Sequence, residues 1–322
     1  MTKLAVLALG GNALLRSNEE GNIDQQNKNT MDTLENIVFL LKENYNLIIT
    51  HGNGPQVGNI LLRNEAGTRD YGIPSMPLDV CVADSQGGIG YTIERNLRNL
   101  LKKYNIQREV ITMASMVEVD PDDHAFVNWT KRVGPTYSEE QKNKLQQENG
   151  WQFKSTPKKE GAYRRVVPSP TPISVMNSSW IKELCERGVI VIASGGGGIP
   201  VYHDQLNNLV PVEGVIDKDM ASSVLATSVG ADEFYILTDV PYLYSDFGTK
   251  DQKVLEFLDY KDAVEYGHKG AFGEGTMQPK VNACLDFVNN GGEKAIITEA
   301  TKLQDRKFGT KITLHYEEVE KA

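Results

Sequence analysis

Three glycine-rich segments follow short apolar runs in this chain, and their backbone could contact an anion directly. They read GGNALL (10–15), HGNGPQVGNILL (51–62) and SGGGGIP (194–200). In the first two, an amphipathic run follows the glycines, so free backbone N–H groups at the start of a helix could face a phosphate. Any one segment could be a tight turn between a strand and a helix. Three of them together favour a shared phosphate site.

None of these segments matches the sequence pattern of a familiar phosphate-binding loop. No stretch reads Gly-x4-Gly-Lys-Ser/Thr, which excludes a P-loop as far as a sequence can. The Gly-x-Gly-x-x-Gly pattern of dinucleotide-binding folds is missed by one residue in 52–58 and again in 195–200. An acidic residue, Asp217, lies at about the right distance for holding a ribose, but beside a lysine. A dinucleotide-dependent oxidoreductase therefore stays open as an alternative.

Without a P-loop lysine, the positive charge that a transferred phosphoryl group requires must come from other residues. Lys218 in VIDKDMASSVLA and Lys280 in GEGTMQPKVNACLDF both stand where a helix is expected to begin. A solvated surface lysine is the ordinary explanation, because positive charge there opposes the helix dipole. The placement becomes favourable if a phosphate binds at the same spot. Asp217 could then hold both ammonium groups in position.

Short apolar runs without alternating polar residues predict strands buried on both faces of a parallel sheet. These runs cover residues 4–9, 47–50, 110–113, 189–193, 234–237 and 295–297. Segments with helical spacing alternate with them, at 31–43, 89–103, 180–187, 221–229 and 280–289. The alternation predicts an α/β fold. Ligands are expected beyond the carboxyl ends of such strands, where the glycines lie.

One segment, residues 121–165, interrupts this alternation. It is polar and rich in lysine, glutamine and glutamate, it shows no strand pattern, and it is followed by the proline-rich VVPSPTP (166–172). A solvated loop is the simple explanation, but unstructured loops of this length are uncommon in compact domains. We therefore predict a small inserted, lid-like subdomain.

Composition limits the possible partners. The chain has 322 residues, of which 40% are hydrophobic and 24% charged, as expected for a globular protein, and its net charge is -9. Binding to nucleic acid or to an anionic membrane would need a local basic patch, and residues 154–165 are the only candidate. No segment approaches the length of a membrane span. We expect neither nucleic acid nor membrane as a partner.

Cysteine usage favours a reducing compartment. The cysteines are few, far apart and without Cys-x-x-Cys spacing, which argues against disulfides and a zinc site; they are Cys81, Cys185 and Cys284. The five histidines show no ligand spacing either, so we expect no metal site made by protein side chains. The first apolar run is shorter than the core of a usual signal peptide. A cytoplasmic location is therefore expected.

Nine segments, in this order, resemble the carbamate kinases, a branch of the amino acid kinase family. They are ALGGNA, HGNGPQVG, MPLDVC, QGGIGY, VVPSP, GGGGIP, VIDKD, ILTDV and GTMQPK, and they span about residues 3–313. A single Gly-Gly-Asn is weak evidence for a family, but nine segments in the same order are specific to one. Other branches of the family carry a lysine two residues before the first Gly-Gly. Ala8 occupies that position here, as in carbamate kinases.

The resemblance implies both a fold and a reaction. The fold is a three-layer α/β/α sandwich around a mostly parallel central sheet, in one domain covering 1–322. Its substrate lobe would span about 1–210, with the insertion at 121–165, and its nucleotide lobe about 211–322. Enzymes of this branch are homodimers that interconvert ATP and carbamate with ADP and carbamoyl phosphate, commonly making ATP at the end of arginine breakdown.

The resemblance also assigns site residues. Lys218 and Lys280 would neutralise phosphate charge with Asp217 organising both, and Lys131 in NWTKRVGP would reach the substrate from the inserted segment. The residues implied for the small substrate and the transferred phosphoryl group are Gly10, Gly11, Asn12, Gly52 and Asn53. The residues implied for the nucleotide are Gly195, Gly196, Gly197, Gly198, Thr238, Asp239, Tyr244, Gly275 and Met277.

Two segments depart from the usual sequence pattern of the carbamate kinases. Tyr163 in KKEGAYRRVVPSP replaces a tryptophan, and HKGAFGEGTM (268–277) is longer than usual, with Thr276 in place of serine. The charged residues named above are all present.

The reaction implied by the resemblance needs little from the protein beyond positive charge and alignment. Carbamate is already an anion and can attack the terminal phosphorus without a general base. Mg²⁺ would enter with ATP or ADP, held mostly by phosphate oxygens and water. A related enzyme that phosphorylates another small carboxylate, or a phosphate, remains an alternative.

Overall fold

An eight-stranded sheet forms the centre of the protein. The structure is a computed structural model, and it describes residues 2–16, 19–156, 160–273 and 277–315. The strands lie in the order β15-β17-β16-β12-β1-β2-β9-β3. From β16 to β3 neighbouring strands are parallel, whereas β17 is antiparallel to β16. Their bounds are Leu4–Leu9 (β1), Asn46–His51 (β2), Val110–Thr112 (β3), Ile190–Ile192 (β9), Glu233–Thr238 (β12), Phe257–Asp259 (β15), Lys294–Glu299 (β16) and Thr310–Thr313 (β17).

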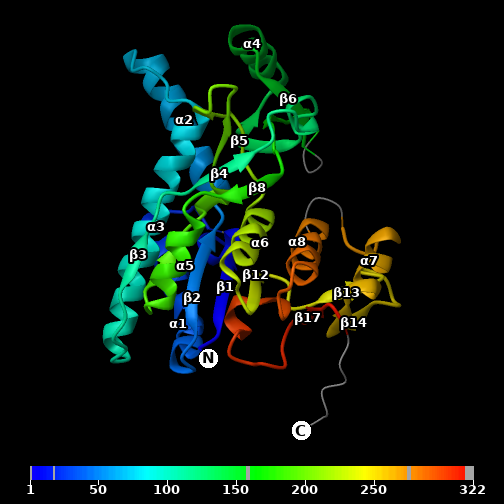
Figure 1. The fold of residues 1–322 in the computed structure, drawn as a ribbon. Helices are drawn as coiled ribbons and strands as arrows, with labels where there is room; N and C mark the ends of the chain where they lie inside the picture. The colour runs from blue at the N-terminus through cyan, green and yellow to red at the C-terminus, as the bar shows by residue number, and fades with distance from the viewer. Residues whose placement is uncertain (1, 17–18, 157–159, 274–276, 316–322) are drawn as a thin grey trace.

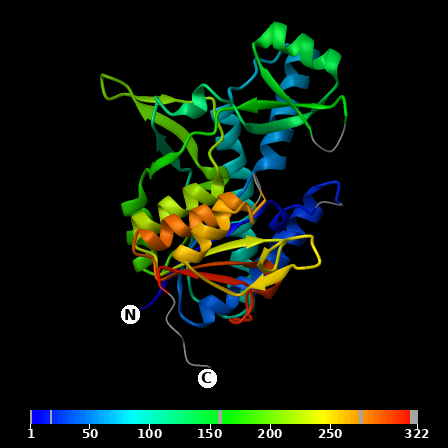
Figure 2. The ribbon, with the colours of Figure 1, turned by 90° about the vertical axis from the view of Figure 1, so that its right-hand side faces the viewer.

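Helices cover both faces of this sheet (Figures 1 and 2). Successive side chains of a strand point to opposite faces. In β1, Ala5, Leu7 and Leu9 pack in one core with helices α1 and α3, while Val6 and Ala8 pack in a second core with α5, α6, α7 and α8. The helices are Ile23–Lys42 (α1), Gly54–Tyr71 (α2), Leu78–Lys103 (α3), Glu139–Asn149 (α4), Ser178–Glu186 (α5), Lys218–Val229 (α6), Tyr260–His268 (α7) and Gln278–Asn289 (α8). The predicted three-layer α/β/α fold is confirmed.

All six predicted strands occur; five of them are buried on both faces and therefore mostly apolar, whereas β3 is an edge strand and exposes Ile111. The predicted helices also occur, although α1 begins at Ile23, eight residues before the expected start, and α3 begins at Leu78, eleven residues before it. The first turns of α1 are polar and show no apolar stripe. A capping box between Asn22 and Gln25 sets its start instead.

A second part of the chain projects from this sandwich (Figure 1). It holds a three-stranded sheet with the order β5-β7-β6, and helix α4 between β5 and β6. A separate four-stranded sheet has the order β11-β10-β4-β8. The bounds are Met116–Val119 (β4), Lys131–Tyr137 (β5), Gln152–Ser155 (β6), Tyr163–Val167 (β7), Pro172–Val175 (β8), Ile199–His203 (β10) and Leu209–Pro211 (β11), and a further hairpin pairs Leu243–Ser245 (β13) with Lys253–Leu255 (β14).

The projecting sheet is anchored by a small apolar cluster. Val133 of β5 and Val167 of β7 pack against Val57 and Leu61 of α2. The sequence pattern showed no strands in 121–165, because β5 and β6 are largely polar and only partly buried. The structure corrects this: β5, α4, β6 and most of β7 lie in the segment.

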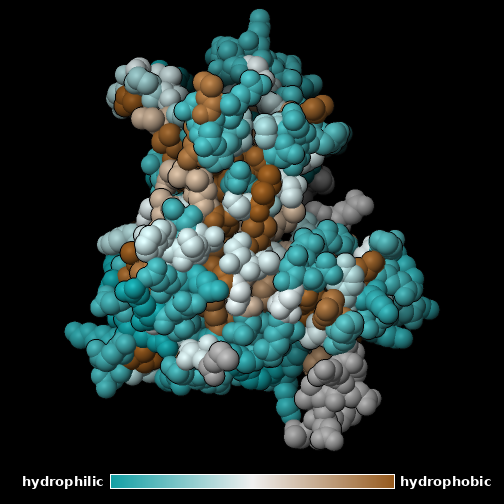
Figure 3. Space-filling view, viewed as in Figure 1, coloured by the Kyte–Doolittle hydropathy of each residue, from teal (hydrophilic) through white to brown (hydrophobic). Residues whose placement is uncertain are grey.

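Hydrophilic side chains cover most of the face shown in Figure 3, and hydrophobic ones gather between the projecting part and the sandwich. Among the helices that the structure describes, none is both long and apolar enough to cross a membrane.

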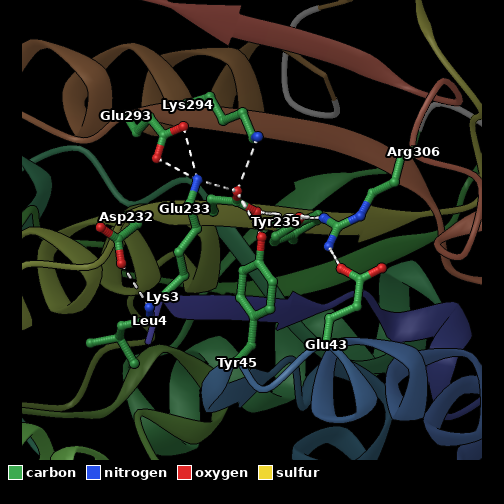
Figure 4. A network of polar contacts seen from close by, with 10 residues as sticks. All are labelled: Lys3, Leu4, Glu43, Tyr45, Asp232, Glu233, Tyr235, Glu293, Lys294 and Arg306. Carbon is green, nitrogen blue, oxygen red and sulfur yellow. Dashed lines mark hydrogen bonds and ion pairs between the residues drawn. The ribbon is translucent and has the colours of Figure 1, made fainter. Parts of the chain in front are cut away.

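A buried carboxylate, that of Glu233 at the start of β12, joins several elements at the amino end of the sheet (Figure 4). Burial would raise the pKa of this carboxyl, but the Tyr235 hydroxyl and the nearby cations outweigh burial and keep the pKa below its ordinary value. The network lies at the opposite end of the strands from the glycine-rich turns. Its members are Lys3 Nζ (3.3 Å), Lys294 Nζ (3.0 Å), the hydroxyls of Tyr45 (3.1 Å) and Tyr235, and Arg306 Nη1 (3.7 Å).

Candidate functional site

The carboxyl ends of four parallel strands bring distant segments to one edge of the sheet. Because β12, β1, β2 and β9 are successive neighbours, the turns that follow them share this edge. The turns begin at Thr238, Gly10, Gly52 and Ala193 respectively. Helices α6 and α8 lie side by side and also begin at this edge, so their free N–H groups add positive potential there.

Two lysines and one aspartate form the centre of the site. Lys218 is the first residue of α6 and Lys280 the third residue of α8. Asp219 pairs with both: its Oδ1 contacts the Lys218 ammonium, and its Oδ2 lies 2.8 Å from Lys280 Nζ. Burial would raise the pKa of Asp219, but the two ammonium groups outweigh burial and hold the pKa at about 2. Asp219 is therefore a fixed negative charge.

Asp217 has a different role from the predicted one. Its Oδ1 accepts hydrogen bonds from the backbone N–H groups of Asp219 (3.0 Å) and Met220 (3.4 Å), which caps α6. Its Oδ2 pairs with Lys131 Nζ at 3.0 Å. The prediction that Asp217 holds Lys218 and Lys280 is wrong, because capping directs this carboxylate toward the first helical turn. Asp219 performs that task.

The site is short of negative charge. Three ammonium groups, those of Lys131, Lys218 and Lys280, face two carboxylates, which leaves a net charge of about +1. Burial, together with the charge of Lys280, lowers the pKa of Lys218 despite the attraction of Asp219. An anion bound beside these groups would stabilise all three ammonium ions.

A cavity of about 640 Å³ opens beside the lysines. Lys218, Lys280, Gly10 and Gly11 line one end of it, and the remaining lining is largely apolar and aromatic. A molecule with phosphates at one end and a flat base at the other matches this distribution. The rest of the lining consists of Thr238, Asp239, Val240, Tyr242, Leu243, Tyr244, Phe247, Ala271, Phe272, Gly273 and Met277.

Four of the nine residues predicted to contact a nucleotide line this cavity. These are Thr238, Asp239, Tyr244 and Met277, while Gly275 lies outside the described residues. Among the aromatic side chains of the lining, sequence reasoning found Tyr244 but missed Tyr242, Phe247 and Phe272. Tyr242 and Phe247 flank β13, and Phe272 follows α7, so no common spacing marked them in the sequence.

The four consecutive glycines lie elsewhere. Gly195, Gly196, Gly197 and Gly198 are buried and, within the part of the chain that the structure describes, are not among the residues lining the cavity. A Cβ on Gly195 would overlap the His51 ring, and one on Gly196, where φ is +67°, would overlap the Asn53 amide. The structure therefore gives no support from this cavity for the prediction that these glycines form a wall of the nucleotide site, which stays a prediction. They allow the turn after β9 to pack tightly on the turn after β2.

Three of the five residues predicted for the small substrate, Gly10, Gly11 and Gly52, lie beside Lys218. Gly10 and Gly11 line the cavity, and Asn12 lies in the 3-10 turn Gly11–Ala13. The Lys218 side chain runs over Gly52, where a Cβ would lie 3.2 Å from Lys218 Cδ. Asn53 is only 4% exposed, and its Nδ2 donates to Ser85 Oγ at 2.9 Å.

His51 offers no base for proton transfer. Burial lowers its pKa to about 4, so the ring is neutral near pH 7. Its Nδ1 lies 3.0 Å from the carbonyl oxygen of Gly52, which fixes Nδ1 as the donor.

No ready-made metal site accompanies these residues. Within the described ranges, no three His, Cys, Asp or Glu side chains are grouped so as to hold a metal ion. The carboxylates of Asp217 and Asp219 are both engaged by ammonium groups.

Comparisons with known proteins give consistent matches. The model of the amino acid kinase family matches residues 3–299. The carbamate kinase of Pyrococcus furiosus is 44% identical over 315 residues, covering 97% of this chain and 99% of the relative, and that of Pyrococcus horikoshii is 43% identical over 316 residues, covering 97% and 100%. The structure of the carbamate kinase from Giardia lamblia bound to AMP-PNP has a TM-score of 0.90 at 36% identity, covering 97% of this chain and 98% of that one.

Proposed function

Because this chain belongs to the amino acid kinase family, among the carbamate kinases, we propose that it interconverts ATP and carbamate with ADP and carbamoyl phosphate. The observation that carries the proposal is the pair of largely buried lysines on Asp219, which line a cavity whose remaining lining is largely apolar and aromatic. The relative from Giardia was solved with AMP-PNP, which supports a nucleotide in the same cavity here.

Phosphoryl transfer in this site would depend on alignment and charge. A carbamate oxygen attacks the terminal phosphorus, the new O–P bond forms, and the bond to the bridging oxygen of ADP breaks with its electron pair left on ADP. No proton moves, which agrees with the absence of a base at His51. Lys218 and Lys280 stabilise the charge on the transferred group, and Lys131 is proposed to hold the carbamate side.

Mg²⁺ is proposed to enter with the nucleotide. The carboxylates next to the lysines are already paired, so the phosphate oxygens and water would supply most of its ligands.

The cellular setting is also part of the proposal. We place the protein in the cytoplasm as a homodimer that generates ATP at the end of arginine breakdown. The three cysteines are free and buried, as suits a reducing compartment. A related acceptor, another small carboxylate or a phosphate, is the second candidate, because other family members share the lysine-based chemistry. Family membership leaves the oxidoreductase alternative without support.

The deciding experiment is ATP formation from ADP and carbamoyl phosphate with Mg²⁺. We expect rapid, enzyme-dependent ATP production. Acetyl phosphate serves as the matched phosphoryl donor, and we expect it to react poorly. ATP from acetyl phosphate but not from carbamoyl phosphate would favour the second candidate. No ATP from either donor would overturn the proposed function.

Replacing Lys131 with alanine should mainly weaken the use of carbamoyl phosphate. The change removes one ammonium group at the site but leaves the cavity lining intact. Loss of one charge-assisted contact predicts a KM for carbamoyl phosphate raised about tenfold or more, with the KM for ADP within about twofold. Initial rates at varied concentrations of each substrate measure both values.

The matched control is Lys154→Ala, an exposed lysine on β6 of the same projecting sheet. We expect its kinetics to equal those of the wild type. If Lys131→Ala also behaved like the wild type, the projecting segment would be no more than a spacer.

A further inference from the structure

Two consecutive polar residues of α3, Ser85 and Gln86, are buried outside the cavity. Each is 2% exposed, and neither is among the described residues that line the cavity beside the lysines. Buried polar groups are costly unless they are hydrogen-bonded. Both of these side chains bond to turns at the carboxyl ends of the strands, and those turns lie at the candidate site.

Ser85 determines how the Asn53 amide is oriented. Its hydroxyl donates its one proton to the Val82 carbonyl oxygen at 2.6 Å. Ser85 Oγ can therefore only accept from Asn53, and it does so from Nδ2 at 2.9 Å. The Asn53 oxygen Oδ1 is thereby directed away from Ser85. If the Asn53 amide were flipped, its Oδ1 would face Ser85 Oγ. Both atoms would then be acceptors, and the hydrogen bond between the two side chains would be lost.

Gln86 holds the neighbouring turns. Its Nε2 donates to the carbonyl oxygens of Gly195 (2.9 Å) and Ser115 (3.2 Å), and its Oε1 accepts from the Ser115 backbone N–H (2.9 Å). The turn that contains Gly195 packs on Asn53 through Gly196, where even a Cβ would overlap the amide. Asn53 is thus held directly by Ser85 and indirectly by Gln86.

We propose that Ser85 and Gln86 are positioning residues for the acceptor side of the reaction: they fix the Asn53 amide and its adjoining turn for carbamate or carbamoyl phosphate. This inference rests on the proposed function and on the role in small-substrate binding that the family resemblance implies for Asn53. Neither residue touches the nucleotide cavity. Their loss should therefore affect the two substrates unequally.

The test compares Ser85→Ala and Gln86→Met with the wild type in ATP formation. Both changes remove the hydrogen bonds with little change in volume, and alanine suits a helix. We expect the KM for carbamoyl phosphate to rise about five- to thirtyfold, with the Kd for ADP, measured by calorimetry, within about twofold. Ser85→Thr keeps the hydroxyl and should recover most of the loss.

The control is Thr92→Ala on the same helix. Among the residues that the structure describes, the Thr92 hydroxyl donates to the Gly88 carbonyl oxygen of its own helix and to no turn at the site, so its loss should leave both constants unchanged. If Gln86→Met fails to fold, the comparison of Ser85→Ala with Ser85→Thr still tests the proposal.

The positioning role would be overturned, in an enzyme whose wild type is active, by any of three results. These are equal weakening of carbamoyl phosphate and ADP binding, a Ser85→Thr variant no better than Ser85→Ala, or variants with unchanged constants. A wild-type enzyme without activity would instead contradict the proposed function.

Discussion

Replacing Lys218 with methionine is expected to lower kcat for ATP formation by about a hundredfold or more. Lys218 lies at the first position of α6 with its side chain 14% exposed, and its ammonium group pairs with Asp219 beside the cavity. Methionine keeps most of the side chain that packs over Gly52 and removes the ammonium group. Loss of one preorganised charge corresponds to about 3 kcal/mol of transition-state stabilisation.

Replacing Lys280 with methionine should lower kcat by a similar factor. The loss in the double variant should be smaller than the sum of the two single losses in free energy. Both lysines pair with Asp219, so removing either one leaves that buried carboxylate less compensated. Residues that act as a unit give non-additive losses. The double variant measured beside the two single variants tests this coupling.

Lys269→Met is the matched control, because Lys269 is exposed and pairs with Glu265 on the surface. It should retain wild-type kcat. Near-normal turnover in Lys218→Met or Lys280→Met would remove these lysines from the proposed chemistry.

The sequence predicted the sandwich well because its central strands are buried on both faces. A run such as LAVLAL of β1 is apolar at every position, and such runs are easy to recognise. The edge strand β15, its neighbour β17 and the polar strands β5 and β6 are partly exposed, so their composition resembles that of loops. Sequence reasoning missed all four for this physical reason.

The site was predictable only in part. Glycines and lysines at strand ends gave its position, since parallel strands end at one edge. The choice between Asp217 and Asp219 could not be made from DKD, because it depends on which carboxylate caps the helix. The packing of Gly196 on Asn53 likewise depends on two turns that are distant in sequence.

Replacing Glu233 with glutamine should lower the free energy of unfolding by about 3 kcal/mol. Glutamine keeps the shape of the side chain and removes the buried charge that Lys3, Lys294 and Arg306 surround (Figure 4). Removing one partner of a buried ion pair costs about 3–5 kcal/mol. We expect the lower end because these three cations are 30% to 40% exposed. Urea denaturation measures the change.

At acidic pH, the difference in the free energy of unfolding between the wild type and Glu233→Gln should become smaller. The folded pKa of Glu233 lies below its ordinary value of 4.5, so its stabilising charge is fully present above that pH. The stabilisation is lost as the pH falls from there through the lower folded pKa. The free energies of unfolding should therefore differ by a constant amount between about pH 5 and 8 and converge below about pH 4.5.

The network lies at the end of the strands opposite the lysines, so kcat of Glu233→Gln below its unfolding temperature should equal that of the wild type. Glu293→Gln is the matched control: Glu293 also pairs with Lys3 but is 52% exposed, and its loss should cost less than about 1 kcal/mol. A difference for Glu233→Gln that stayed constant down to about pH 3 would show that packing, and not the ionised carboxylate, is what stabilises this end of the sheet.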